Sequence, residues 1–86
     1  MYTIQYYKQA IKDIPRLRAA HLSEKAQQLI DILRENPFQM PPQYEALKGD
    51  KAGFYSRRIN IQHRLIYMVD EERKLVRIVR MWTHYE

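Results

Sequence analysis

The sequence contains no cysteine, only two glycines and no long apolar run. Without cysteine the chain cannot form disulfides, thiolate zinc sites, iron–sulfur clusters or a cysteine nucleophile. Two glycines are too few for either of the common glycine-rich loops that bind phosphate groups. The longest uncharged run, Asn36 to Tyr44, is far too short to span a membrane and contains three prolines. The N-terminus has no basic segment followed by an apolar one, so we expect no signal peptide and a cytoplasmic protein without a membrane partner.

The rest of the composition is that of one small globular domain, residues 1–86. Apolar residues make up 45% of the chain and charged residues 29%, whereas a disordered chain would be poorer in apolar groups. A chain of 86 residues cannot hold two hydrophobic cores. Because so small a core stabilises a fold only modestly, we expect a protein partner or self-association as a homodimer to add to its stability.

Positive charge is concentrated in the C-terminal part. The formal net charge is +5, and residues 51–86 carry eight basic and four acidic side chains, against seven and six in residues 1–50. A phosphate backbone is the natural partner of a basic surface. A merely soluble basic surface explains the charge equally well.

The spacing of apolar residues predicts an α+β fold. Residues 2–6 alternate as a strand does, and two stretches with helical spacing follow, at residues 8–18 and from Leu22 to Leu33. We expect Pro15 to kink or end the first helix, because proline removes a backbone donor. Three strands are predicted beyond them, at Phe54–Ile59, Gln62–Val69 and Lys74–Thr83. The order β-α-α-β-β-β places two N-terminal helices on one face of a small, mainly antiparallel twisted sheet.

A long connector, Pro37 to Gly53, separates the helices from these strands. Connectors of this length in a small domain are usually disordered or functional. Three apolar side chains favour an ordered segment pinned to the body of the protein: Phe38, Tyr44 and Leu47.

Alternation along the strands predicts which face of the sheet is buried. The face under the helices should carry Leu65, Tyr67, Val69, Leu75, Val79 and Met81. The opposite face should carry Arg58, Arg64 and Arg80, continued in the same phase by Trp82 and His84. Like charges that face each other across neighbouring strands repel and destabilise the sheet. An anion bound between them would remove this cost, so the arrangement favours an anion-binding face. A solvated outer face is the competing interpretation.

The residue types exclude most catalytic classes. Ser56 lacks a histidine-plus-carboxylate setting, and the three histidines lack the spacing of a metal site, so we expect neither a metal nor a cofactor. Acid–base chemistry remains, and RNA suits it because RNA supplies its own nucleophile, the 2′-hydroxyl. The candidates for this chemistry are Glu45, Arg58, Arg64 and His84.

Several motifs resemble one toxin family. The blocks are YEALKG at 44–49, GFYSRRI at 53–59, HRLIY at 63–67 and the closing pair His84-Tyr85. They look like the Txe/YoeB toxins of the RelE/ParE superfamily of toxin–antitoxin modules, and the likeness in length and element order spans essentially the whole chain. It implies a microbial-RNase/RelE-like fold and an endoribonuclease that cuts translated mRNA in the ribosomal A site. It also implies a cognate antitoxin that holds the toxin inactive.

The same resemblance implies roles for six residues. Glu45 would be the general base, His84 the general acid and Arg64 the group that stabilises the phosphorane. Either Glu45 or His84 can act as the base, so their roles can be exchanged. Phosphate and nucleotide binding would fall to Lys48, Arg58 and Tyr85.

Two other functions remain open from the sequence. A ParE-like toxin with the same fold would inhibit DNA gyrase without cutting nucleic acid, and a non-catalytic module would dock on RNA or the ribosome. Substitution of His84 separates them, because it should abolish only cutting. Two further residues carry structural interpretations: Arg57 should pair with a helix carboxylate or the antitoxin, and Trp82 should either stack on a base or cap the edge of the core.

Overall fold

The computed structural model describes residues 1–84, with the side chains of residues 1–83. Two helices near the N-terminus are followed by most of the sheet. The elements in chain order are β1 (Thr3–Tyr6), α1 (Lys8–Ala19), α2 (Ser23–Glu35), β2 (Tyr44–Ala46), the 3₁₀ turn η1 (Gly49–Lys51), β3 (Phe54–Arg58), β4 (His63–Asp70) and β5 (Leu75–His84). The predicted order of elements is confirmed, with β2 as an additional short strand inside the connector.

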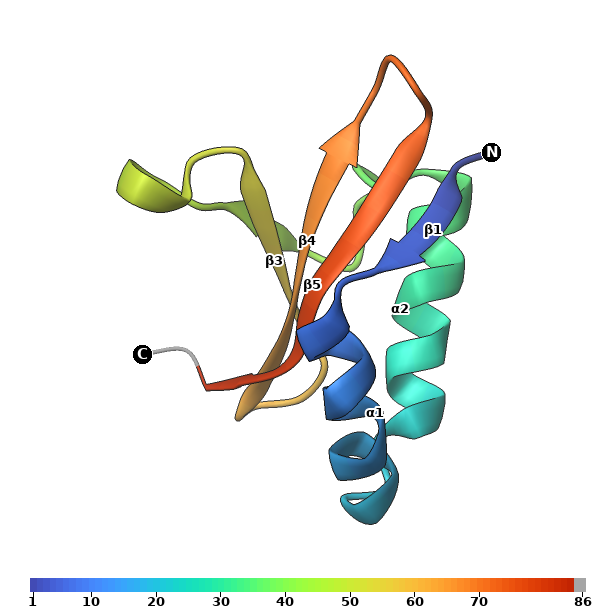
Figure 1. The fold of residues 1–86 in the computed structure, drawn as a ribbon, viewed down its shortest axis with the longest axis vertical. Coiled ribbons are helices and arrows are strands. Elements are labelled where there is room, and N and C mark those ends of the chain that lie inside the picture. Colours follow the sequence, from blue (N-terminus) through green and yellow to red (C-terminus); the bar gives the residue numbers. More distant parts are fainter. Residues whose placement is uncertain (85–86) are drawn as a thin grey trace.

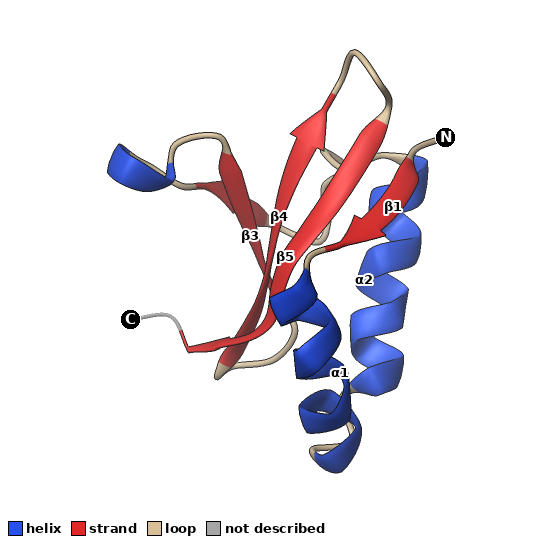
Figure 2. Ribbon diagram, viewed as in Figure 1, coloured by secondary structure: helices blue, strands red, loops and turns tan. Residues whose placement is uncertain are grey.

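The five strands form one mixed sheet in the order β1-β5-β4-β3-β2. Only β1 and β5 run parallel, and the other neighbours are antiparallel. Figure 1 shows α1 and α2 on one side of this sheet and η1 on the other, and Figure 2 shows the same division by element type. The predicted α+β class is therefore confirmed. In the part of the chain that the structure describes, no helix combines the length and the apolar character that crossing a bilayer requires.

Helix α2 packs against the sheet with the stripe that its sequence predicts, namely Ala26, Leu29, Ile30 and Leu33, all of them buried. Helix α1 buries a more mixed set of side chains. Its buried residues are Ala10, Asp13 and Leu17, whereas Ile11 is 54% exposed. The buried stripe of α1 thus includes a carboxylate in place of an apolar side chain.

Pro15 does not end α1, so the early end of the helix, one of the two expected outcomes, was wrong. The helix continues to Ala19. Pro15 and Ile11 both lie on the exposed side of the helix. Proline at position 15 removes the partner of the Ile11 carbonyl, and on this side water can hydrate that group.

Strand β5 does not alternate regularly, and the phase predicted for it was wrong. Val76 and Ile78 belong to the core, and so does Met81, whereas Val79 is only half-buried. Val79 has no partner in β4, because Ile66 pairs with Arg80 and Tyr67 pairs with Ile78. An extra residue in one strand is a β-bulge, and it inverts the phase of the residues that follow.

The connector is ordered, and Arg57 explains why. Arg57 is fully buried and donates hydrogen bonds to the carbonyls of Pro37, Gln39 and Pro42. The expectation that Arg57 pairs with a helix carboxylate was wrong, since its guanidinium donates to connector carbonyls and to the hydroxyl of Tyr67. A cluster of aromatic rings lies beside it: Phe38, Tyr44, Tyr55 and Tyr67. Together these contacts fix the strand β2 that follows the connector's prolines.

Candidate active site

A groove of about 160 Å³ opens on the sheet face opposite the helices. Strand register explains its position. Glu45 of β2 pairs with Ser56 of β3, and Arg58 of β3 pairs with Arg64 of β4. Paired residues project to the same side of a sheet, and these four alternate with residues of the helix-covered face. The groove is lined by Pro42, Gln43, Tyr44, Glu45, Ser56, Arg58 and Arg64.

Arg64 forms the floor of this groove. Its side chain is only 9% exposed, and its Nη1 lies 3.2 Å from the hydroxyl of Ser56 and 3.4 Å from Oε1 of Glu45. The Glu45 side chain is 51% exposed, so its carboxylate meets both the guanidinium and solvent. A half-exposed carboxylate beside a buried guanidinium can take up a proton while the cation holds an anion, because phosphate oxygens are natural guanidinium partners.

The other predicted residues differ in how they relate to the groove. Arg58 is exposed at its rim, opposite Arg64 as predicted. Lys48 is exposed in the segment after β2 and is not among the lining residues. His84 pairs through its backbone with His63, directly next to the pair Arg64–Thr83, and its side chain lies outside the described residues. Tyr85 lies outside them altogether.

Arg80 and Trp82 differ from their predicted placement. By register Arg80 shares the open face with Ile66, but its guanidinium donates to the carboxylate of Asp13 on α1, 3.1 Å away. Trp82 packs against the core, and its ring stacks on His63 with centroids 3.7 Å apart. Of the two interpretations of Trp82, capping of the core edge is confirmed. Arg80 is paired with an acidic residue of α1, so the two arginines that line the groove are Arg58 and Arg64.

A buried phenol supports the groove from the other side of the sheet. Tyr67 donates a hydrogen bond to the Pro37 carbonyl and accepts one from Arg57 Nε. Burial raises the pKa of Tyr67 to about 12, against the opposing effect of the Arg57 charge. The phenol is therefore neutral at ordinary pH and keeps donating to the connector.

The described residues contain no group of three or more His, Cys, Asp or Glu side chains that could hold a metal ion. The polar side chains that line the groove include a carboxylate, two guanidinium groups and a hydroxyl.

Sequence reasoning missed two polar residues that the structure brings forward. Ser56 was considered only as a nucleophile, and its role as a hydrogen-bond partner of Arg64 depends on cross-strand register. Asp13 was overlooked, although its position carried a signal. It lies three residues after Ala10 and four before Leu17, within the apolar stripe of α1. A charged residue at such a position needs a buried partner.

The fold and the groove describe a small basic α+β protein whose open sheet face carries Glu45, Arg58 and Arg64 around one groove. The family model described as YoeB-like toxin of bacterial type II toxin-antitoxin system matches residues 6–85. Toxin YoeB of Escherichia coli (strain K12) is 39% identical over 62 residues, which cover 72% of this chain and 71% of that toxin. The chain therefore belongs to the YoeB-like toxins of bacterial type II toxin–antitoxin systems.

Solved structures agree with this assignment. The YoeB/ParE toxin from Agrobacterium tumefaciens superposes with a TM-score of 0.86 at 29% identity, covering 96% of this chain and 99% of that chain. A heterotetrameric YoeB-YefM toxin-antitoxin complex from Staphylococcus aureus gives a TM-score of 0.81 at 30% identity, covering 99% of both chains. The YoeB dimer from Staphylococcus aureus gives the same TM-score and identity and covers 98% of both chains.

Proposed function

We propose that this protein is a ribosome-dependent mRNA endonuclease that inhibits translation by cutting messages in the A site. The observation that carries the proposal is the contact of Arg64 with both Ser56 and Glu45 on an open sheet face rimmed by Arg58. Membership of the YoeB-like toxins supports the same conclusion.

The groove supplies two of the three tasks in RNA cleavage by the 2′-hydroxyl. Glu45 removes the proton from that hydroxyl, because its carboxylate is half-exposed and lies at the groove. The oxygen then attacks the adjacent phosphorus. Arg64 stabilises the negative charge that develops on the phosphorane, since its guanidinium is already held in place by Ser56.

The third task is protonation of the departing 5′-oxygen, which we assign to His84. An imidazole titrates near neutrality and can give up a proton there. The backbone of His84 ends β5 and pairs with His63, one position beyond the Arg64–Thr83 pair. Arg58 and Lys48 hold phosphates, and Tyr85 orients the scissile nucleotide. The reaction requires neither a metal nor another cofactor.

We also propose a cognate antitoxin as the physiological partner. The open basic face and the small core are features that an acidic segment could cover while folding on the toxin. The Staphylococcus aureus relative is solved both with an antitoxin and as a dimer. Size-exclusion chromatography after co-expression with the neighbouring gene should give one co-eluting complex, and the toxin alone tests the homodimer. Separate elution at micromolar concentration would contradict the partnership.

The function is tested by primer extension on an mRNA translated in a cell-free bacterial system, with and without ribosomes. Wild-type protein should give discrete cuts that require ribosomes. Glu45→Gln and His84→Ala should each lower the cleavage rate by about 10²- to 10⁴-fold, the usual contribution of an acid or base.

Matched controls separate chemistry from loss of charge. Glu24→Gln makes the same change as Glu45→Gln on an exposed position of α2. Arg58→Ala should also cut more slowly, because it removes a charge that would hold phosphate, and Arg73→Ala at an exposed turn is its control. Both controls should cut at wild-type rates. Intact message with ongoing translation would overturn the ribosomal nuclease, and a gyrase supercoiling assay would then test the ParE-like alternative. Ribosome binding without cutting would favour the docking module.

A further inference from the structure

Asp13 is a buried acidic residue that the proposed chemistry does not use. It is fully buried in α1, although a carboxylate is costly to remove from water. Its Oδ2 accepts hydrogen bonds from Arg80 Nε at 3.1 Å and from the backbone N–H groups of Met81 at 2.9 Å and Trp82 at 3.2 Å. Its Oδ1 lies 3.9 Å from Nη1 of Arg16. One carboxylate oxygen therefore gathers three donors from successive residues of β5.

These donors lie at an irregularity of the sheet. Arg64 pairs with Thr83 and Ile66 with Arg80, so the single residue Leu65 faces both Met81 and Trp82. Two residues opposite one define a β-bulge, which bends its strand. In Figure 1 the last part of β5 turns away from the two helices. The two backbone N–H groups that donate to Asp13 belong to Met81 and Trp82, which are the two residues of this bulge.

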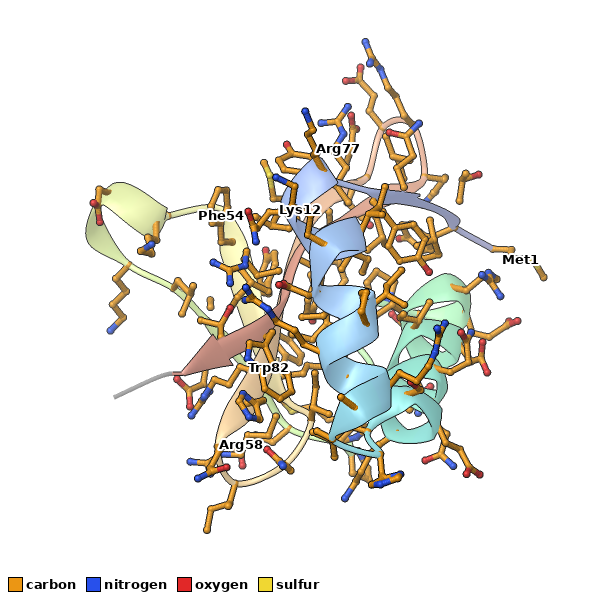
Figure 3. All side chains as sticks on the ribbon, turned by 60° about the horizontal axis from the view of Figure 1, so that its bottom comes forward. Met1, Lys12, Phe54, Arg58, Arg77 and Trp82 are labelled. Carbon is orange, nitrogen blue, oxygen red and sulfur yellow. The ribbon has the colours of Figure 1, made fainter. Side chains whose placement is uncertain are left out.

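The edge of β5 that faces β1 explains why Asp13 of α1 can accept these hydrogen bonds. Strand β1 covers β5 only as far as the pair Tyr6–Ile78. Beyond it the backbone N–H groups of β5 need another acceptor, because buried donors without partners are costly. Helix α1 begins directly after β1 and brings Asp13 to that place, and Figure 3 shows Trp82 beside α1.

The bulge decides which residue of β5 meets which residue of β4. Adding or removing one residue in a strand moves every following side chain to the other face. With the bulge, Thr83 pairs with Arg64 and His84 pairs with His63. Without it, the end of β5 would be shifted by one position relative to the groove.

We propose that Asp13 is a positioning residue that fixes the bulged end of β5, and through it the place from which His84 acts. The catalytic part of this inference rests on the proposed nuclease function. The structural part, the link between Asp13 and the phase of β5, stands on the three hydrogen bonds alone.

The structural part is tested with Asp13→Asn, which keeps the size of the side chain and removes its charge. Asp31→Asn is the matched control, because it makes the same change on an exposed face of α2. In Asp13→Asn the amides of Met81 and Trp82 should exchange with solvent at least about tenfold faster by NMR. Fluorescence should also shift, and the chain's one tryptophan makes that signal unambiguous. Unchanged exchange and fluorescence would overturn the proposal.

The catalytic part is tested by single-turnover cleavage on programmed ribosomes. Misplacement of His84 should lower the rate at saturating ribosomes by about tenfold or more, while the half-saturating concentration changes less than about twofold. In a His84→Ala background, Asp13→Asn should add almost nothing, because both changes remove the same step. The positioning role would be contradicted if Asp13→Asn lowered the cleavage rate by its full factor in the His84→Ala background. It would also be contradicted if Asp13→Asn weakened ribosome binding and left the rate at saturation unchanged.

Two outcomes need separate interpretation. If Asp13→Asn does not fold, Arg80→Met replaces it, because that change removes one of the three donors and leaves the carboxylate with both backbone amides. It should give a smaller effect of the same kind, and the absence of any effect would count against the proposal. If the wild-type protein does not cut, the proposed function and the catalytic part both fail, and amide exchange still decides the structural part.

Discussion

Arg57 and Arg58 are neighbours in β3 with opposite surroundings. Arg57 is fully buried and donates to three connector carbonyls, whereas Arg58 is exposed at the groove. Arg57→Ala leaves these carbonyls without their partner, so we expect the free energy of unfolding to fall by about 3 kcal/mol. Arg58→Ala should change it by less than about 0.5 kcal/mol. Urea unfolding of both variants is the measurement, and equal losses would contradict the buried role of Arg57.

Tyr67 makes stability depend on pH in alkaline solution. Its pKa is raised to about 12 in the folded protein, against about 10 for an unfolded tyrosine. Between these values the unfolded state binds fewer protons than the folded state, so the stability contributed by the neutral phenol falls as pH rises. The expected slope is about 1.4 kcal/mol per pH unit from this residue. Urea unfolding at pH 9 and 11 should show a smaller pH effect for Tyr67→Phe than for wild type.

At the scale of elements, α1 has a buried side that differs from a simple apolar stripe. Leu17 is 2% exposed and Ile11 is 54% exposed. We expect Leu17→Ala to cost about 2–5 kcal/mol through the cavity it leaves. Ile11→Ala should stay within about 0.5 kcal/mol, because its side chain is largely in water and alanine favours a helix. Both variants replace an aliphatic side chain of α1 by alanine, so a comparison of their thermal unfolding checks which side of the helix is buried.

Local sequence patterns predicted most of the helices and strands, and three of the residues that line the groove were among the candidates: Glu45, Arg58 and Arg64. Helical spacing predicted α2, and alternation predicted β3 and β4. The structure brings two of the candidate site residues, Glu45 and Arg64, within 3.4 Å of each other. The phase of β5 could not be predicted, because its two bulges, at Val79 and at Met81–Trp82, appear only in the cross-strand register. The second bulge is hydrogen-bonded to a carboxylate of another element, more than sixty positions away in sequence. Strand β2 is only three residues long and shows too little alternation to be recognised.

At the scale of the whole molecule, the helices and the sheet share one core. Side chains of α1, α2, β4 and β5 belong to the same buried cluster, and Trp82 packs against it. Residues 1–86 should therefore unfold as one cooperative unit, which is the prediction for a single domain. Far-UV circular dichroism reports on the helices and fluorescence on Trp82. Their urea transitions should coincide, and different midpoints would mean that the chain unfolds in parts.

The placement of β5 has a consequence for when the protein can become active. Strand β5 lies between β1 and β4 and also contacts both helices, yet it is translated after every other described element. Until it emerges, β1 has no neighbouring strand and the helices lack much of the surface on which they pack. A nascent chain therefore cannot complete the fold, nor unite the groove with the end of β5, while β5 is still being made. Under the proposed function, the ribosome that synthesises the chain meets no complete active site until β5 has emerged.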